Sequence, residues 1–262
     1  MSHLFLFIFG TAIGSFLNVL IDRLPREESI NGRSHCEFCK KTLSPLDLIP
    51  VVSFLFLKGK CRYCGEKLSW QYPGIEILTG VLFVAISNFK FPILPINQLP
   101  ITNIQLLIPN LGIISCLIVI FFIDLKNKII PDEMQIALFI SIFFLRVMGS
   151  IGVVGVMWGI LEGGIVMLPI LLLYLITRGR GMGFGDVKLA FNMGFFLGIK
   201  GGFVAIYLGF ILGAFFGILL LLLKKKKMKS KIAFGPFLVL GILILIFLRD
   251  PIFQLIQRIY GI

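Results

Sequence analysis

Two aspartates are the residues of this sequence whose placement most clearly points to chemistry. Asp124, in FFIDLKNKIIPDE, and Asp186, in GMGFGDVKLA, each lie where an apolar segment meets a short polar loop. An ionisable side chain at membrane depth, or at the membrane edge, is energetically unfavourable and is therefore a functional candidate. Two carboxylates brought together can share one proton, so that one is ionised and the other neutral. Such a pair can activate water and cleave a peptide bond.

Both aspartates also have ordinary structural explanations. Asp124 would end a helix, where a carboxylate opposes the helix dipole, and it could instead be a solvated residue beside the lysines that follow. Asp186 could cap a helix N-terminus, although the glycines before it would let another chain approach closely. Asp132 follows Pro131 and has the pattern of a helix start. We therefore rank Asp132 below Asp124 as a catalytic candidate.

Four of the five cysteines lie in the one long polar segment, residues 22–72, called the cysteine module below. They form two Cys-x-x-Cys pairs, Cys36 with Cys39 and Cys61 with Cys64. Two such pairs provide the four thiolates of a closed, tetrahedral, structural zinc site. Free thiols or redox pairs are the alternative, whereas disulfides are disfavoured in a reducing cytoplasm. The module has few large apolar residues, so we expect it to need the metal in order to fold.

The composition is that of a polytopic membrane protein. Hydrophobic residues make up 58% of the 262 residues, and the chain contains 27 phenylalanines. The sequence predicts an all-α fold, because helices satisfy their own backbone hydrogen bonds in lipid. The expected transmembrane helices, about eight of them, are residues 3–21, 73–90, 103–123, 134–149, 152–177, 187–199, 202–223 and 233–249. The sixth is too short for an upright span. We expect the first to be a retained span, because it has neither a basic start nor a clear cleavage site.

The basic residues predict the orientation of the chain. Of the 25 Lys and Arg residues, 20 fall in segments 22–72, 124–133, 178–188 and 224–231. The positive-inside rule places these segments in the cytoplasm and the N-terminus outside. The net charge of +12 is then explained by membrane flanks, so nucleic-acid binding is not expected. The segment KKKKMKSK at 224–231 is either a contact with anionic lipid or a solvated topology anchor.

The expected organisation is thus a first transmembrane helix (1–21), the cytoplasmic cysteine module (22–72) and a transmembrane bundle (73–262). Within this bundle a third acid, Glu162, lies near the middle of an apolar segment. Glu162 could act in a relay or transport pathway, or it could be a packed acid with a polar partner. Its role stays open on the sequence alone.

The motifs resemble those of the type IV prepilin peptidases, a family of membrane aspartic proteases with a GxGD motif. The resemblance begins with GSFLNVLIDRLP at 14–25 and continues through both cysteine pairs and SWQYPGIEILTG at 69–80. It then includes DLKNKIIPDE at 124–133, GMGFGDVKLA at 181–190 and AFGPFLVLG at 233–241. It covers nearly the whole chain in the order typical of the family.

This resemblance implies that Asp124 and Asp186 are the catalytic pair. It also implies a substrate that is a prepilin or pseudopilin with a short basic leader and an apolar helix, cut at the cytoplasmic face of the membrane. Many members also N-methylate the new terminus with S-adenosylmethionine, although the sequence has no glycine loop of a soluble methyltransferase. Glu76 and the FGPF sequence also look like family positions, without a role that the residues themselves indicate.

Two other classes of function remain as alternatives. A proton-coupled membrane transporter could use Asp124, Glu162 and Asp186, although the halves of the sequence show no repeat of the kind common in transporters. A membrane scaffold could instead bind a cytoplasmic partner through the cysteine module. A scaffold would depend on the cysteines and not on the aspartates.

Overall fold

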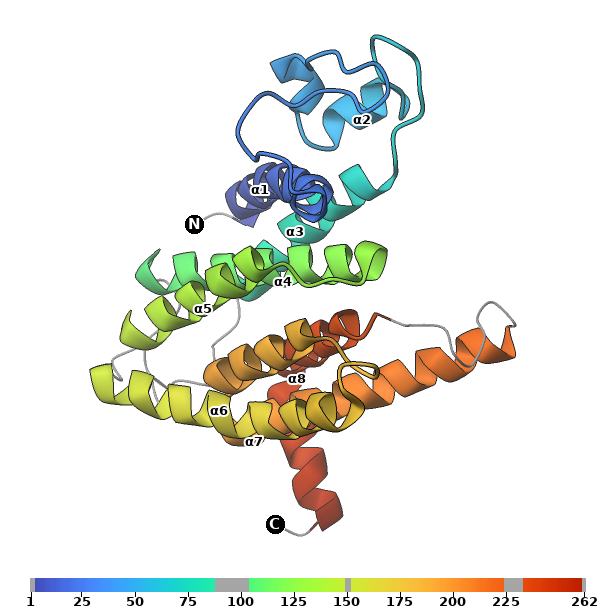
Figure 1. Ribbon diagram of the computed structural model, residues 1–262. Helices are drawn as coiled ribbons and strands as arrows, with labels where there is room; N and C mark the ends of the chain where they lie inside the picture. Colours follow the sequence, from blue (N-terminus) through green and yellow to red (C-terminus); the bar gives the residue numbers. More distant parts are fainter. Residues whose placement is uncertain (1–2, 88–103, 149–151, 224–232, 261–262) are drawn as a thin grey trace. The chain divides into compact units, whose positions relative to one another are not determined.

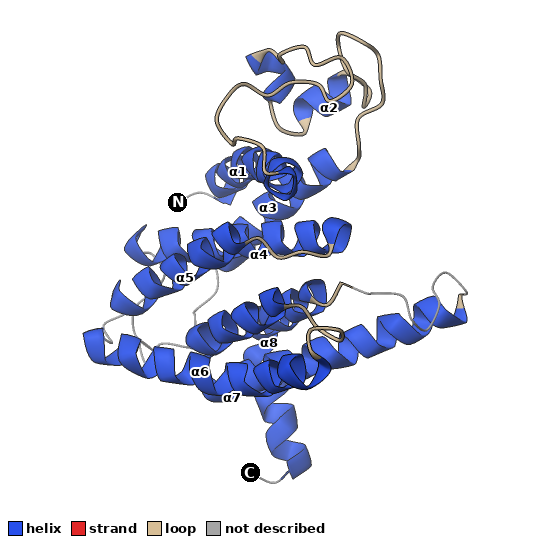
Figure 2. Ribbon diagram, in the orientation of Figure 1, coloured by secondary structure: helices blue, strands red, loops and turns tan. Residues whose placement is uncertain are grey.

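The computed structural model describes residues 3–87, 104–148, 152–223 and 233–260. These residues form helices and loops, and no β-strand occurs among them (Figures 1 and 2). The long helices are α1 (His3–Arg23), α3 (Gln71–Ser87), α4 (Ile104–Asn127), α5 (Asp132–Arg146), α6 (Gly152–Thr177), α7 (Phe184–Leu222) and α8 (Gly235–Tyr260). Between α1 and α3 lie the short helices η1 (Leu24–Arg26), η2 (Pro45–Leu48) and α2 (Val52–Phe56). The prediction of an all-α fold is confirmed.

Helix α7 consists of two segments that fold back on each other at Gly198. This residue has φ 74° and ψ 179°, a conformation that is essentially restricted to glycine. A Cβ atom placed on Gly202 would lie 3.2 Å from the Cα atom of Gly194. Residues eight positions apart in one straight helix are separated by about 12 Å. The chain therefore reverses at Gly198, and residues 184–197 form the short sixth segment that the sequence predicts.

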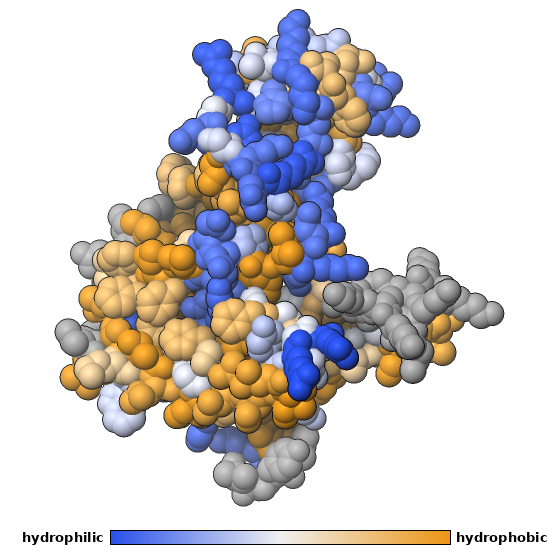
Figure 3. Space-filling model, in the orientation of Figure 1, coloured by the Kyte–Doolittle hydropathy of each residue, from blue (hydrophilic) through white to orange (hydrophobic). Residues whose placement is uncertain are grey.

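With α7 counted as two segments, helices occupy all eight expected regions. Helices α1, α4, α6, α7 and α8 are long and apolar enough to cross a membrane, and α3 is a shorter apolar helix. Apolar side chains cover much of the helical surface in Figure 3, as expected for helices that face lipid. The chain is thus a multi-pass membrane protein. The ends of the expected spans at 88–90 and 149, residue 103, and the basic segment 224–231 lie outside the described residues.

The chain divides into two compact units. The first comprises Met1–Asn88 and Leu111–Val119, and the second comprises Phe89–Asn110 and Ile120–Ile262. In the first unit, α1 and α3 pack backbone to backbone through glycines. A Cβ atom on Gly10 would lie 2.7 Å from the Cα atom of Gly80, and one on Gly14 would lie 2.7 Å from the Cα atom of Glu76. This spacing is the small-residue contact that lets membrane helices approach closely.

In the second unit, α5 packs along the short first segment of α7. The ring of Phe139 stacks on that of Phe195, with 4.9 Å between the ring centroids, and also meets Phe191. Polar contacts lie at both ends of this aromatic stack. One end carries Gln135, whose contacts are described below, and the other carries Arg146.

Arg146 is a buried cation whose described contacts satisfy all three guanidinium nitrogens. It donates hydrogen bonds to the backbone carbonyls of Phe195 and Gly155 at 2.6 and 3.0 Å, and to the carboxylate of Glu162 at 2.8 Å. The other oxygen of Glu162 lies against Gly198, where a Cβ atom would be 3.3 Å away. The pair therefore joins α5, α6 and the chain reversal of α7. Glu162, left open by the sequence, is a packed acid with a cationic partner.

Candidate active site and metal centre

Asp124 lies one turn before the end of α4 and is buried, with 5% of its surface exposed. Lys128 ends the helix in the left-handed conformation, with φ 58°, and its backbone N–H bonds to the Asp124 carbonyl at 2.9 Å. The carboxylate faces the start of α8. A Cβ atom on Gly235 would lie 2.7 Å from Oδ2 of Asp124, so only glycine leaves room there for the carboxylate.

Asp186 is the third residue of α7, two positions beyond the first helical residue, Phe184. Its Oδ2 atom accepts a hydrogen bond of 3.0 Å from the backbone N–H of Gly183. The residue that caps the helix is Gly183 and not Asp186. The alternative that Asp186 is the N-cap is therefore wrong, although one of its carboxylate oxygens accepts a hydrogen bond from the backbone of the capping residue. The other oxygen is left over for a different role.

The structure brings these two aspartates together. Their carboxylates are near enough to interact electrostatically. Ile130, in the turn after α4, contacts two glycines of this region. Gly185 directly precedes Asp186, and Gly235 packs against the Asp124 carboxylate. Cβ atoms on Gly185 and Gly235 would lie 3.0 and 3.1 Å from the Ile130 side chain. A compact corner therefore forms from the end of α4, the turn after it and the first residues of α7 and α8.

Each aspartate has one buried oxygen without a hydrogen bond of good geometry from any described residue, although the backbone of Gly235 faces the Asp124 carboxylate. These atoms are Oδ2 of Asp124 and Oδ1 of Asp186. Buried carboxylate oxygens are normally satisfied, so two unsatisfied ones in the same corner need an explanation. A bound water or a substrate carbonyl between them would supply the missing contacts. The arrangement suits acid–base chemistry on a group placed there.

Gln135 and Asn192 hold Asp186 in place, and the sequence analysis missed both. Gln135 of α5 donates a hydrogen bond of 3.1 Å to the carbonyl of Gly185, the residue before Asp186. Asn192, two turns further along α7, donates at 2.8 Å to the side-chain oxygen of Gln135. Both side chains are 4% exposed. The sequence does contain a signal for these two residues. Both are amide side chains within apolar segments, and amides in a membrane bundle need hydrogen-bond partners.

Asp132, the weaker candidate, is the first residue of α5 and forms an ion pair of 2.7 Å with Lys188 of α7. Its side chain is 65% exposed. The prediction that Asp132 begins a helix is confirmed. The corner with unsatisfied oxygens contains Asp124 and Asp186 instead.

In the first unit, the four module cysteines come together, although 21 residues separate the two pairs in the chain. The sulfur atoms of Cys36, Cys39, Cys61 and Cys64 all lie within 4.8 Å of one another. Backbone hydrogen bonds shape each pair into a tight turn, such as that from Lys40 N–H to the Cys36 carbonyl at 2.9 Å. Four sulfurs at this spacing could hold one metal ion in a closed, tetrahedral site.

The backbone around the second pair favours a thiolate. Hydrogen bonds from the backbone of Cys64, and also that of Tyr63, lower the pKa of the Cys61 thiol to about 7. The backbone of Glu66 acts in the same direction on Cys64, but desolvation and the neighbouring thiols raise the pKa of Cys64 to about 12. Negative charges this close together repel one another, and a cation among the sulfurs would relieve that repulsion. A divalent metal would meet this need.

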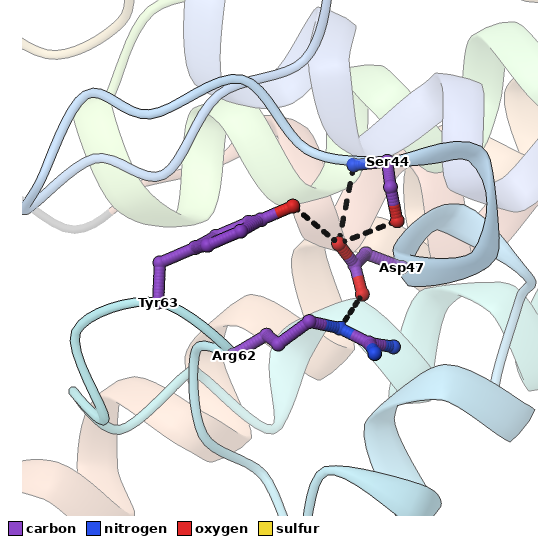
Figure 4. Close-up of polar contacts among 4 residues, drawn as sticks. All are labelled: Ser44, Asp47, Arg62 and Tyr63. Carbon is purple, nitrogen blue, oxygen red and sulfur yellow. Dashed lines mark hydrogen bonds and ion pairs between the residues drawn. The ribbon is translucent and has the colours of Figure 1, made fainter.

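Asp47 ties η2 to the second cysteine pair (Figure 4). Its carboxylate accepts hydrogen bonds from the backbone N–H and the hydroxyl of Ser44 at 3.1 and 2.8 Å, and forms an ion pair with Arg62 at 2.6 Å. The Tyr63 hydroxyl lies 3.4 Å from the same carboxylate. Burial opposes ionisation, but the hydrogen bonds from Ser44 and Arg62 hold the pKa of Asp47 below its usual value. Asp47 thereby fixes the two residues that lie between Cys61 and Cys64.

A cavity of about 420 Å³ lies between the cysteine module and helices α1 and α3. Glu76 of α3 lines it and accepts a hydrogen bond of 2.7 Å from the backbone of Val51. Asp22 also lines it and accepts a hydrogen bond from the Tyr72 hydroxyl at 3.0 Å. Asn18, on the same wall, has a buried side-chain oxygen without a hydrogen-bond partner among the described residues. The lining is polar and mixed in charge, because arginines and lysines line the cavity as well as acids, and the Asn18 oxygen is still to be satisfied.

Two family models match the chain. The model described as the Bacterial Peptidase A24 N-terminal domain matches residues 8–89. The model described as the Type IV leader peptidase family matches residues 111–218. The first match includes the cysteine module, and the second includes both Asp124 and Asp186.

Several curated relatives carry the name prepilin leader peptidase/N-methyltransferase. The relative from Bacillus subtilis (strain 168) is 34% identical over 94% of each chain. That from Legionella pneumophila is 32% identical over 94% of this chain and 91% of the relative, and that from Aeromonas hydrophila is 30% identical over 90% and 87%. No solved structure matches the chain. The sequence, over nearly its full length, belongs to the type IV leader peptidase family.

Proposed function

We propose that this protein is a membrane aspartic endopeptidase that removes the basic leader from type IV prepilins or pseudopilins, with Asp124 and Asp186 as its catalytic pair. One observation carries the proposal: two acids far apart in the chain meet in a buried corner, each with an unsatisfied oxygen. The names of the relatives support the same activity. No finding favours a transporter, and Glu162 is already paired with Arg146.

The chemistry follows from one shared proton. The ionised aspartate accepts a proton from water, and the resulting hydroxide attacks the peptide carbonyl carbon. The neutral aspartate gives its proton to the carbonyl oxygen, which becomes negative in the transition state. Collapse of the tetrahedral intermediate then breaks the C–N bond, and a carboxyl proton passes to the leaving amine. Because the two groups titrate as a pair, neither role is assigned to one residue.

The distribution of basic residues supports an inner-membrane orientation with the N-terminus outside and both the catalytic pair and the cysteine module on the cytoplasmic side. A basic leader stays on that side for the same reason. Its cleavage site would then lie at the depth of Asp124 and Asp186, while the apolar helix of the substrate remains in lipid.

Replacement of either acid by its amide tests the catalytic pair. Asp124→Asn and Asp186→Asn should each lower leader cleavage by about 10²–10⁴-fold, because an amide can neither accept nor donate the shared proton. Cleavage of a purified prepilin in detergent, followed by gel shift, measures this loss. Asp132→Asn, which removes only an exposed ion pair, is the matched control and should cleave normally. Normal cleavage by either of the first two variants would exclude the proposed pair.

Gln135 should act as a positioning residue for Asp186. Gln135→Leu removes both of its side-chain hydrogen bonds and should lower kcat about tenfold, equivalent to roughly 1.4 kcal/mol of barrier, while KM changes little. Gln135→Glu, when ionised, still accepts from Asn192 but cannot donate to the Gly185 carbonyl. If the Gly185 contact matters, this variant should behave like Gln135→Leu. Steady-state kinetics of the two variants measure these changes. A normal kcat in both variants would refute the positioning role of Gln135.

We also propose that the four module cysteines hold a structural Zn²⁺. Their sulfur spacing and the low pKa of Cys61 support this assignment. With four thiolate ligands the site has no open position, so it would support folding and would not activate water.

Metal analysis tests the site. Purified protein should contain one zinc per chain, and Cys36→Ser should lose it because three thiolates leave the site open to exchange. Cys116→Ser, which removes the buried cysteine of α4, is the control and should retain the metal. Wild-type protein without zinc by inductively coupled plasma mass spectrometry would rule out the assignment.

A second activity, N-methylation of the new terminus, is favoured by the cavity of the first unit. The relatives' name includes N-methyltransferase, and the cavity is lined by acidic and basic side chains and by the unsatisfied amide oxygen of Asn18. We propose that Asp22, Asn18 and Glu76 would hold S-adenosylmethionine, which supplies an activated methyl group on a sulfonium. The mixed lining suits a ligand that carries both a sulfonium and a carboxylate, and the lining carboxylates can accept the proton that the amine releases.

Asp22→Asn separates the two activities. The variant keeps an oxygen to accept the Tyr72 hydroxyl hydrogen bond but loses the charge. Methyl transfer should fall about tenfold or more, as expected for the loss of a charge-assisted contact, while leader cleavage stays normal. Mass spectrometry of the mature N-terminus measures methylation, and the gel shift measures cleavage. Unchanged methylation, or an equal loss of both activities, would contradict the assignment of this cavity.

A further inference from the structure

The cysteine module exposes a group of large apolar side chains on a surface that is mainly hydrophilic (Figure 3). Phe56 is 84% exposed, Trp70 is 75% exposed and Leu55 is 61% exposed. The group is called the apolar patch here and comprises Leu48, Ile49, Val52, Leu55, Phe56 and Trp70. A soluble surface rarely exposes so many large apolar residues together unless it contacts another apolar phase.

The orientation of the apolar patch is held by α2, which has one buried face and one exposed face. Phe54 forms the inner face and is buried. Its ring would lie 3.1 Å from a Cβ atom on Gly59, and it meets the ring of Trp70 edge to face, with the centroids 4.9 Å apart. The chain turns at Lys58 and Gly59, which both have positive φ. With Phe54 anchored inward, Leu55 and Phe56 are held outward.

Trp70 shows at which depth this surface lies. It directly precedes α3, the apolar helix that begins at Gln71. Tryptophan at the end of a membrane helix lies at the boundary between lipid and water. Because Phe54 contacts Trp70, α2 must lie at about the same depth as this boundary. The apolar patch is therefore next to the lipid headgroups and not in bulk water.

The charges around the patch fit a lipid surface. No acidic residue occurs between Asp47 and Glu66, whereas Lys58 and Lys60 directly follow α2 and are exposed. Lysine stems lie along apolar surface while their ammonium groups reach water or phosphate. Exposed aromatic and aliphatic residues flanked by lysines are the pattern of segments that lie in the membrane interface.

We propose that the apolar patch inserts into the headgroup region of the leaflet where α3 starts, with Lys58 and Lys60 on anionic phosphates. The occupant of this surface is lipid. The insertion holds the cysteine module, and the cavity beneath it, flat against the membrane. A protein partner, or the second unit of this chain, would cover the same side chains without giving them contact with lipid.

Depth-dependent fluorescence quenching tests the proposal on the full chain. The two native tryptophans, Trp70 and Trp158, are replaced by Phe, and one new tryptophan is introduced by Phe56→Trp. The matched control is Phe38→Trp, at an aromatic residue of the same module that is 62% exposed and outside the patch. Both proteins are placed in vesicles of phosphatidylethanolamine and phosphatidylglycerol, with or without lipid brominated high on the acyl chain.

A side chain buried about 5–10 Å into the interface should lose about half of its emission to the brominated lipid. We expect this loss at position 56, and little at position 38, where aqueous acrylamide should quench instead. Replacing Lys58 and Lys60 by Glu should reduce the lipid quenching at position 56. The proposal is overturned if position 56 is not quenched by lipid, which is the result for a surface covered by protein. It is equally overturned if both positions are quenched alike.

Discussion

A carboxylate inside a helical membrane bundle is unfavourable unless something compensates its charge, and the second unit of this protein contains three such acids. Glu162 is compensated by Arg146, whose guanidinium nitrogens all have described partners. Asp124 and Asp186 have no cation in the described corner, and each keeps a buried oxygen without a hydrogen bond. The contrast separates an acid that supports the fold from two acids with oxygens left available for the proposed chemistry. The packing of the other helices in the second unit keeps these two acids in position.

That support comes largely from α5. Near its start, Gln135 holds the carbonyl next to Asp186, and at its end Arg146 holds the carbonyl of Phe195. The first segment of α7 is thus fixed at both ends, with the Phe139 stack between them. A segment of 14 residues is about 21 Å long, too short to be positioned by spanning lipid alone. Fixing both ends compensates for this shortness and keeps Asp186 beside Asp124.

The sequence was sufficient for features that depend on nearby residues or on composition. The helical segments, the paired cysteines and the two acids of the proposed pair all have local signals, such as apolar length, Cys-x-x-Cys spacing and an acid at a span edge. The missing features depend on contacts between distant segments. Gln135 is 50 positions from Gly185, and Arg146 is 49 positions from Phe195, whose carbonyl it binds. The role of Gly235 likewise became clear only from the carboxylate that packs against it.

The two proposed activities impose an order on each other. The amine that would be methylated does not exist until the peptide bond is cut, because before cleavage that nitrogen is an amide whose lone pair is delocalised into the carbonyl. The proposed cleavage at Asp124 and Asp186 would therefore have to precede the proposed methyl transfer in the cavity of the first unit. In the proposed order of steps the apolar helix of the substrate would stay in lipid throughout, so the substrate would pass from the first reaction to the second without leaving the membrane.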